Sequence, residues 1–141
     1  MNIEPILLTT VRVQTYQGGR HLTNATGFFF ERDERLFLVS SLHVFIDPAN
    51  AHHHDRLEIE LHIGDERLSQ SIFFSIPLFE HGLSIWLNCS DSAGDVDVAV
   101  VEINREALPG NTVYRAFSPA HLPQQEAAIE VGDSLLVVGF P

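Results

Sequence analysis

The chain consists largely of short segments in which apolar and polar residues alternate, and polar turns separate these segments. In residues 57–63, for example, Leu57, Ile59, Leu61 and Ile63 fall on one face of an extended chain. This period of two is typical of a half-buried β-strand. No segment sustains the helical period of 3.6, and only the residues after His43 indicate a helical turn. The pattern predicts strands at residues 9–16, 22–31, 36–40, 57–63, 71–77, 83–87 and 96–103.

Short strands at this spacing predict an antiparallel all-β domain. The tight polar turn Arg32-Asp33-Glu34-Arg35 joins two of the strands into a hairpin. With 141 residues, of which 45% are hydrophobic, the chain has material for one domain with a buried core. We therefore expect a small barrel or sandwich of roughly six or seven antiparallel strands over residues 1–103.

The composition changes after Ile103. Residues 104–133 contain several prolines and glycines and predict a long, mostly extended connection. A continuous apolar run from Ser134 to Phe140 then predicts one more strand. A strand with no partner would leave an open edge, so it either pairs back onto the barrel or begins a second barrel of a longer protein over residues 134–141. The same edge could join two copies of the chain into a homodimer by strand addition.

Charge and composition exclude several classes of partner. The net charge of −11 would repel nucleic acid and anionic membrane surfaces. No window approaches about eighteen apolar residues, so no segment is expected to span a membrane. The amino terminus lacks the features of a signal peptide, and the single cysteine, Cys89, allows no internal disulfide. We expect a cytoplasmic protein in which Cys89 has no catalytic role.

One stretch, LVSSLHVF at residues 38–45, places a histidine directly after an apolar strand. This histidine could be structural, closing the strand and hydrogen-bonding a backbone carbonyl. It could also be a general base, because imidazole is the side chain that titrates near neutrality. The stretch alone favours the structural interpretation, and a second stretch at residues 95–101 reverses that preference.

Four motifs occur in a distinctive order along the chain: ATGFF at 25–29, LVSSLHV at 38–44, DVDVAVV at 95–101 and VGDSLLVVGFP at 131–141. In this order they resemble the trypsin-like serine peptidases of the chymotrypsin fold, particularly the single-chain bacterial branch. The resemblance covers essentially the whole chain. It implies that residues 1–103 form the first Greek-key barrel of a double-barrel peptidase, and that residues 134–141 begin the second.

The resemblance also implies roles for two residues. His43 would be the general base, and Asp97 the carboxylate that orients its ring. The expected activity is hydrolysis of peptide bonds in protein or peptide substrates through an acyl-enzyme, without a cofactor. The family's nucleophile lies in a Gly-x-Ser-Gly motif, and these 141 residues contain none. We therefore expect the chain to be inactive alone, with its nucleophile beyond this sequence.

Three aspartates compete for the role of orienting carboxylate. Strand alternation places Asp97 on the same face as Ala99 and Val101. Asp95 shares that face but lies further out, towards solvent, and Asp91 lies beyond a glycine. Asp97 could also simply cap its strand. We expect Asp97 to be substantially buried and within about 2.6–3.2 Å of His43 Nδ1, or somewhat further without substrate.

Two other functions stay open as alternatives. The barrel could have lost catalysis and act as an interaction or regulatory module. The run His52-His53-His54, with His62 nearby, could instead form a metal-binding loop. Consecutive histidines point in different directions, and no spaced set of cysteines or carboxylates completes a ligand shell. A solvated loop without metal is therefore the preferred interpretation.

Overall fold

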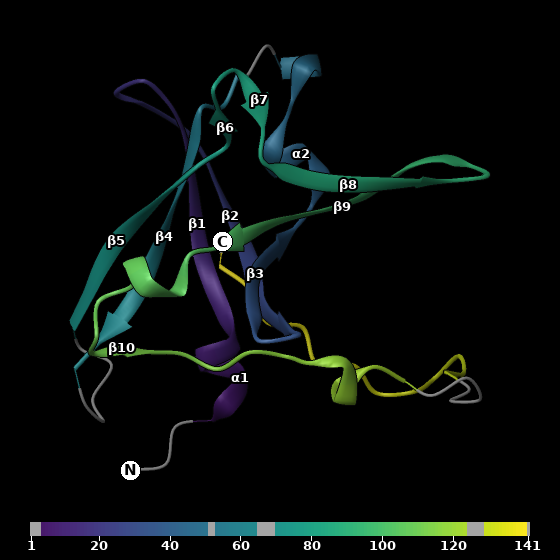
Figure 1. Ribbon diagram of the computed structural model, residues 1–141. Helices are drawn as coiled ribbons and strands as arrows, with labels where there is room; N and C mark the ends of the chain where they lie inside the picture. The colour runs from purple at the N-terminus through teal and green to yellow at the C-terminus, as the bar shows by residue number, and fades with distance from the viewer. Residues whose placement is uncertain (1–3, 51–52, 65–69, 124–128, 141) are drawn as a thin grey trace.

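The computed structural model describes residues 4–50, 53–64, 70–123 and 129–140 (Figure 1). Helices in these ranges are single turns: α1 (Pro5–Thr9), α2 (Leu42–Phe45), and the 3₁₀ turns η1 (Pro48–Asn50), η2 (Arg105–Ala107) and η3 (Pro119–His121). The strands are β1 (Thr10–Gln17), β2 (Arg20–Arg32), β3 (Arg35–Ser40), β4 (Arg56–Ile63), β5 (Gln70–Pro77), β6 (Phe79–Glu80), β7 (Leu83–Ser84), β8 (Trp86–Asp91), β9 (Gly94–Ile103) and β10 (Thr112–Val113). In the described ranges, no helix has the length and apolar character that crossing a membrane requires.

The strands pair antiparallel, which confirms the all-β prediction. The main sheet has eight strands in the order β10-β4-β1-β2-β3-β9-β8, with β5 also paired to β4. Strands β6 and β7 form a separate small hairpin. The predicted strand at residues 83–87 is divided at Ile85, because β7 pairs with β6 across the turn at His81 and Gly82, whereas β8 pairs with β9.

Chain continuity links the two ends of this sheet. Among the residues that the structure describes, β5 pairs only with β4 and β8 only with β9, yet the two follow each other along the chain with the β6–β7 hairpin between them. Leu78 is fully buried, and its carbonyl accepts a hydrogen bond from Ile85 N–H at 3.0 Å. Among the described residues no ladder joins β5 to β8, so the sheet is curved but not closed by hydrogen bonds. The Greek-key barrel stays a prediction.

The core fills the concave side of the sheet. The alternation seen in the sequence decides which side chains enter it, as in β4, where Leu57, Ile59 and Leu61 are at most 2% exposed. Burying each such side chain stabilises the fold by about 1.5–3 kcal/mol. The largest fully buried side chains come from strands far apart in sequence and from α2: Phe45, Leu36, Leu38, Leu57, Ile59, Leu78, Val13 and Val101.

Gly27 allows β2 and β3 to pack closely beside this core. A Cβ atom at position 27 would lie 2.8 Å from Leu38 Cδ1 and 3.0 Å from the carbonyl oxygen of Val39. Real Cβ atoms do not approach carbonyl oxygens so closely without a backbone shift. Glycine is therefore required at position 27 by space rather than by its φ angle.

The predicted strand from Ser134 to Phe140 is wrong, because residues 134–140 form no strand. The segment contacts β2 through a side chain and not through a backbone ladder: the Thr26 hydroxyl accepts a hydrogen bond from Phe140 N–H at 2.7 Å. The carbonyl of Thr26 already accepts a hydrogen bond from Ser40 Oγ at 2.7 Å. The predicted connection at 104–133 is extended in part, but its strand β10 pairs with β4.

A bidentate ion pair joins β3 to β9 at the end opposite His43. Arg35 Nε and Nη2 lie 3.0 and 2.6 Å from the two carboxylate oxygens of Glu102. The hydrogen bond from Arg35 lowers the pKa of Glu102 below its ordinary value of 4.5. Both side chains are about half exposed, so solvent screens the pair.

We predict that Gly27→Ala lowers the free energy of unfolding by about 1–3 kcal/mol, because the added methyl overpacks against Leu38 and the Val39 carbonyl. Urea unfolding followed by tryptophan fluorescence measures this change. Gly19→Ala is the matched control, since nothing lies within 4 Å of a Cβ there and its φ is not positive. Equal effects of the two substitutions would contradict the packing argument.

The ion pair predicts a weak acid dependence of stability. A carboxyl whose pKa is lowered on folding adds stability above its unfolded pKa, and this stability is lost as the pH falls through the folded pKa. Glu102→Gln should therefore reduce the loss of stability between pH 5 and pH 3, as measured by urea unfolding at each pH. Arg35→Gln should reduce this acid-dependent loss of stability to a similar extent, and the double variant should show no further reduction. If the effects of the two substitutions add in the double variant, the two side chains act independently.

Candidate active site

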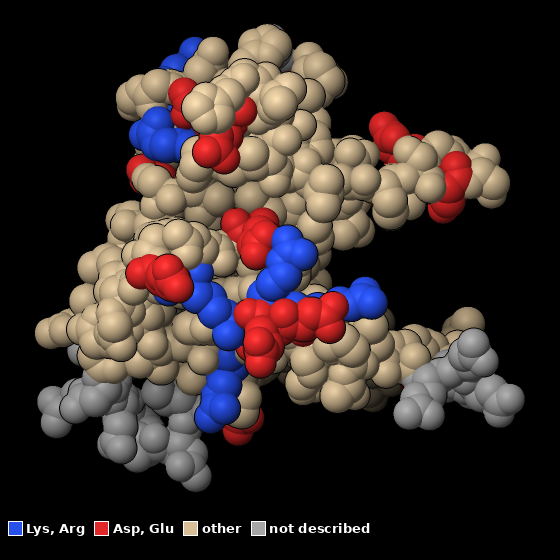
Figure 2. All heavy atoms as spheres, viewed as in Figure 1, with Lys and Arg blue, Asp and Glu red and all other residues tan. Residues whose placement is uncertain are grey.

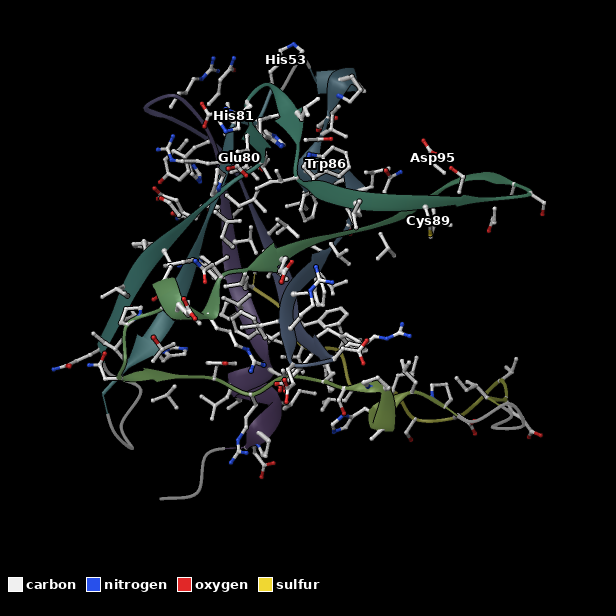
Figure 3. All side chains as sticks on the ribbon, in the orientation of Figure 1. His53, Glu80, His81, Trp86, Cys89 and Asp95 are labelled. Carbon is white, nitrogen blue, oxygen red and sulfur yellow. The ribbon has the colours of Figure 1, made fainter. Side chains whose placement is uncertain are left out.

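Two buried neighbours hold His43 at the end of β3. After Ser40 the chain continues through extended Ser41 into the single turn α2. Val44 and Phe45 are 4% and 1% exposed, and the Phe45 ring lies 5.6 Å from the Trp86 ring on β8, centroid to centroid. Figure 3 labels Trp86 where β8 begins beside α2. The turn is thereby anchored in the core, while the His43 side chain projects outward and is 63% exposed.

An irregularity in the β8–β9 ladder lies at Asp97. Asn88 pairs with Ala99, but the next pair is Ser90 with Asp95, so residues 96–98 lie opposite the single residue Cys89. Extra residues of this kind form a β-bulge, which bends a strand and redirects a side chain, and bulges are frequent beside active sites. Beyond the bulge, Ala99 and Val101 on β9 are buried as the alternation predicts.

The structure brings His43 and Asp97 together. His43 Nδ1 lies 3.2 Å from Asp97 Oδ2 and 3.4 Å from Oδ1. The backbone N–H of His43 also donates to Oδ1 at 3.3 Å. The distance lies at the upper end of the expected range. The backbone contact was not anticipated, because nothing in a sequence pattern reports the direction of an N–H after a strand end.

The two competing aspartates are engaged elsewhere on the hairpin. Asp95 accepts a hydrogen bond from Ser90 Oγ at 2.6 Å, and Asp91 accepts one from Ala93 N–H at 2.8 Å. Figure 3 shows Asp95 and Cys89 on opposite sides of the β8–β9 hairpin. Cys89 is an exposed free thiol. Asp97 is therefore the carboxylate that this fold places at His43.

The expectation that Asp97 is substantially buried is wrong. Its side chain is 63% exposed, as is that of His43. The reason is visible in Figures 1 and 2, where the β8–β9 hairpin, whose strand β9 carries Asp97, projects from the body of the molecule. Water competes for both partners in such a position, so their hydrogen bonds are weaker than they would be in a shielded site.

A shallow hollow of about 280 Å³ adjoins the pair. Asp97 and Val98 form one wall, β2 and β3 supply the floor, and Val138 approaches from the terminal segment; the other lining residues are Thr10, Thr26, Gly27, Phe28, Val39, Ser40 and Ser41. The lining is mainly apolar. Ser40 Oγ is already bonded to the Thr26 carbonyl, so it is not directed at the imidazole.

The arrangement leaves one ring nitrogen of His43 available. Nδ1 faces the carboxylate, and within the described ranges no side chain bonds to Nε2. A carboxylate at Nδ1 favours the tautomer with a proton on Nδ1 and a lone pair on Nε2. A ring in this state can accept a proton from a nucleophile that approaches Nε2.

The alternative metal site receives no support. His52 lies outside the described residues, His53 is exposed and His54 is 4% exposed. Two consecutive histidines with such different burial do not face a common centre. In the part of the chain that the structure describes, no group of three or more histidine, cysteine or carboxylate side chains could hold a metal ion.

Comparison with protein-family models, with curated proteins and with solved structures found no match. The function must therefore be inferred from the residues themselves and from the geometry in which the fold holds them.

We predict that Asp97 sets the tautomer of His43. Imidazole ¹⁵N chemical shifts, recorded where the ring is neutral, should show the proton mainly on Nδ1 in the unmodified protein. Asp97→Asn should move a substantial part of the population to the Nε2–H tautomer, because the amide can offer its N–H to Nδ1. Asp95→Asn is the control and should leave the shifts unchanged. Identical tautomer populations in all three proteins would mean that the Asp97 contact is absent in solution.

Proposed function

We propose that this chain is the histidine- and aspartate-bearing part of a trypsin-like serine peptidase that hydrolyses peptide bonds in protein or peptide substrates. The observation that carries the proposal is the distance of 3.2 Å between His43 Nδ1 and Asp97 Oδ2, with Nε2 left available. The collinear resemblance of four motifs to that family is a second, independent support.

Each residue has a defined task in this chemistry. Asp97 holds the proton of His43 on Nδ1 and stabilises the ring when it becomes positively charged. Nε2 accepts the proton of a serine hydroxyl as that oxygen attacks the substrate carbonyl. His43 then returns the proton to the amine that leaves, and water repeats the sequence on the acyl-enzyme.

The proposal requires a serine from outside these 141 residues, because the sequence contains no Gly-x-Ser-Gly motif. The second barrel that would carry this serine would also have to cover Asp97, whose side chain is 63% exposed. Shielding would strengthen the charge-assisted hydrogen bond. The chain topology supports a first barrel as well, since only the β6–β7 hairpin separates β5, which pairs with β4, from β8, which pairs with β9.

The second candidate is a barrel of the same ancestry that binds partners without catalysis. The exposure of the dyad and the lack of a nucleophile in this sequence favour it. In either case we propose a cytoplasmic location, because the one cysteine, Cys89, is a free thiol.

We predict that the coding sequence beyond Pro141 contains a Gly-x-Ser-Gly segment, and that the full polypeptide reacts with a fluorophosphonate probe. His43→Ala should abolish this labelling because the serine loses its base. Asp97→Asn should slow it greatly; the corresponding change lowers kcat about 10⁴-fold in the type enzyme of this fold. Asp95→Asn should leave the rate within about twofold. The measurement is the rate of probe incorporation into intact protein.

Two results would contradict the proposal. One is stoichiometric labelling of a serine within these 141 residues when they are expressed alone, which would show that the nucleophile does not come from outside them. The other is a full-length polypeptide that fails to label although its unfolding curve shows a normal fold, which would favour the non-catalytic module.

A further inference from the structure

Three strands form open edges of the described sheet: β10, β8 and β5. An open edge can pair with another chain, and native proteins usually blunt it with charges, bulges or a short length. Strand β10 has only two residues. Strand β8 ends at Asp91 and contains the irregular register at Cys89. Only β5 lacks these protections.

Strand β5 is long, regular and uncharged. Its eight residues, QSIFFSIP, pair with β4 without a register shift, and the single proline, Pro77, stands at its last position. The described part of the chain places no strand on its other side, and Figure 1 shows β5 at the outer edge of the sheet. A neutral edge rich in β-branched and aromatic residues is well suited to pairing.

The hydrogen-bond pattern shows which backbone groups of β5 face outward. Leu78 N–H donates to the Asp55 carbonyl at 3.0 Å, in the same register that pairs Arg56 with Pro77. In an antiparallel ladder, alternate residues bond to the neighbouring strand. Even-numbered residues of β5 therefore bond to β4, and the N–H and C=O groups of Ser71, Phe73 and Ser75 point to the free edge.

The side chains of these outward-bonding residues are exposed. Phe73 is 54% exposed, although it is a large aromatic residue, and Ser71 and Ser75 beside it are exposed as well. The alternate residues Ile72 and Phe74 pack against the core and are half-buried. A strand added to this edge would thus extend an apolar layer on one face and cover Phe73 on the other.

We propose that β5 is a self-association surface, on which the β5 strand of a second copy adds antiparallel about a two-fold axis at Phe73. In this register Phe73 pairs with Phe73 of the partner subunit, and Ser71 pairs with Ser75 of the partner subunit. These are the residues whose backbone groups face outward, so each pair exchanges two hydrogen bonds. A two-fold interface requires such self-complementarity.

Both faces of the added pair match in this register. On the exposed face the two Phe73 rings cover each other, and aromatic pairs across strands are stabilising. On the core face Ile72 lies opposite Phe74 of the partner subunit. No charged side chain of β5 enters the contact. The strand is thus complementary to a second copy of itself, and its lack of charge adds no repulsion at the contact between two chains of net charge −11.

We predict a dimer whose formation rises with protein concentration and with salt, since salt screens the repulsion between two acidic chains. Sedimentation equilibrium of the full chain measures it. Phe73→Lys should weaken association at least tenfold by placing two ammonium groups at the axis. The control Phe79→Lys changes a residue of similar exposure, 46%, outside β5 and should have no effect.

Further variants distinguish a β5 dimer in this register from a dimer formed through residues 134–140 or in another register. Val137→Lys, at a residue 90% exposed, would abolish a dimer formed through residues 134–140 and should leave a β5 dimer intact. In a Cys89→Ser background, Phe73→Cys should give a disulfide-linked dimer on mild oxidation. Ser71→Cys should not, because its two copies would be separated by about four residues of strand, beyond disulfide reach.

The outcomes decide the proposal. A chain that stays monomeric to about 1 mM at high salt overturns it, as does a dimer that Phe73→Lys leaves unchanged. Cross-linking through Ser71→Cys rather than Phe73→Cys would disprove the register. Circular dichroism of each variant shows whether a loss of association comes from unfolding.

Discussion

The antiparallel ladder between β3 and β9 is the constraint on which the site depends. It pairs Leu36 with Ile103 at one end and Ser40 with Ala99 at the other. Because the strands run in opposite directions, the carboxyl end of β3 lies beside the early part of β9. His43 follows Ser40 by one turn and Asp97 precedes Ala99 by two residues, so the ladder brings an imidazole and a carboxylate together from positions far apart in sequence.

This ladder can hold its register because packing fixes it on both sides. On the inner side, Leu36, Leu38 and Val101 are at most 1% exposed, and a slip by one residue would turn them to solvent. Beside them, Gly27 lets β2 approach β3 closely. Phe45 then secures the turn that carries His43. The exposed dyad is thus positioned by residues that have no chemical role of their own.

The sequence predicted the features that depend on the local pattern of apolar and polar residues. It missed the features that depend on how strands and segments distant in sequence pack against one another. Alternation located β4 to within one residue, and it placed Asp97 on the face of Ala99 and Val101, which are buried. Asp95 shares that face, and its position further out is what distinguished it from Asp97. The bulge opposite Cys89 could not be predicted, since it results from the register of two strands. The terminal apolar run failed as a strand for the same reason: apolar character favours a strand, but only a free ladder makes one. The prediction that Asp97 is buried was wrong because alternation indicates which way a side chain points, but not whether another element covers it.

The His43–Asp97 dyad and the free edge of β5 lie on different parts of the described sheet. The dyad lies where β3, α2 and β9 meet, whereas the free backbone groups of β5 lie beyond β4, at the opposite side in Figure 1. A strand added to β5 would therefore leave the hollow beside Asp97 uncovered. The proposed self-association and the proposed peptidase chemistry are thus compatible in one molecule, because neither uses a residue that the other requires.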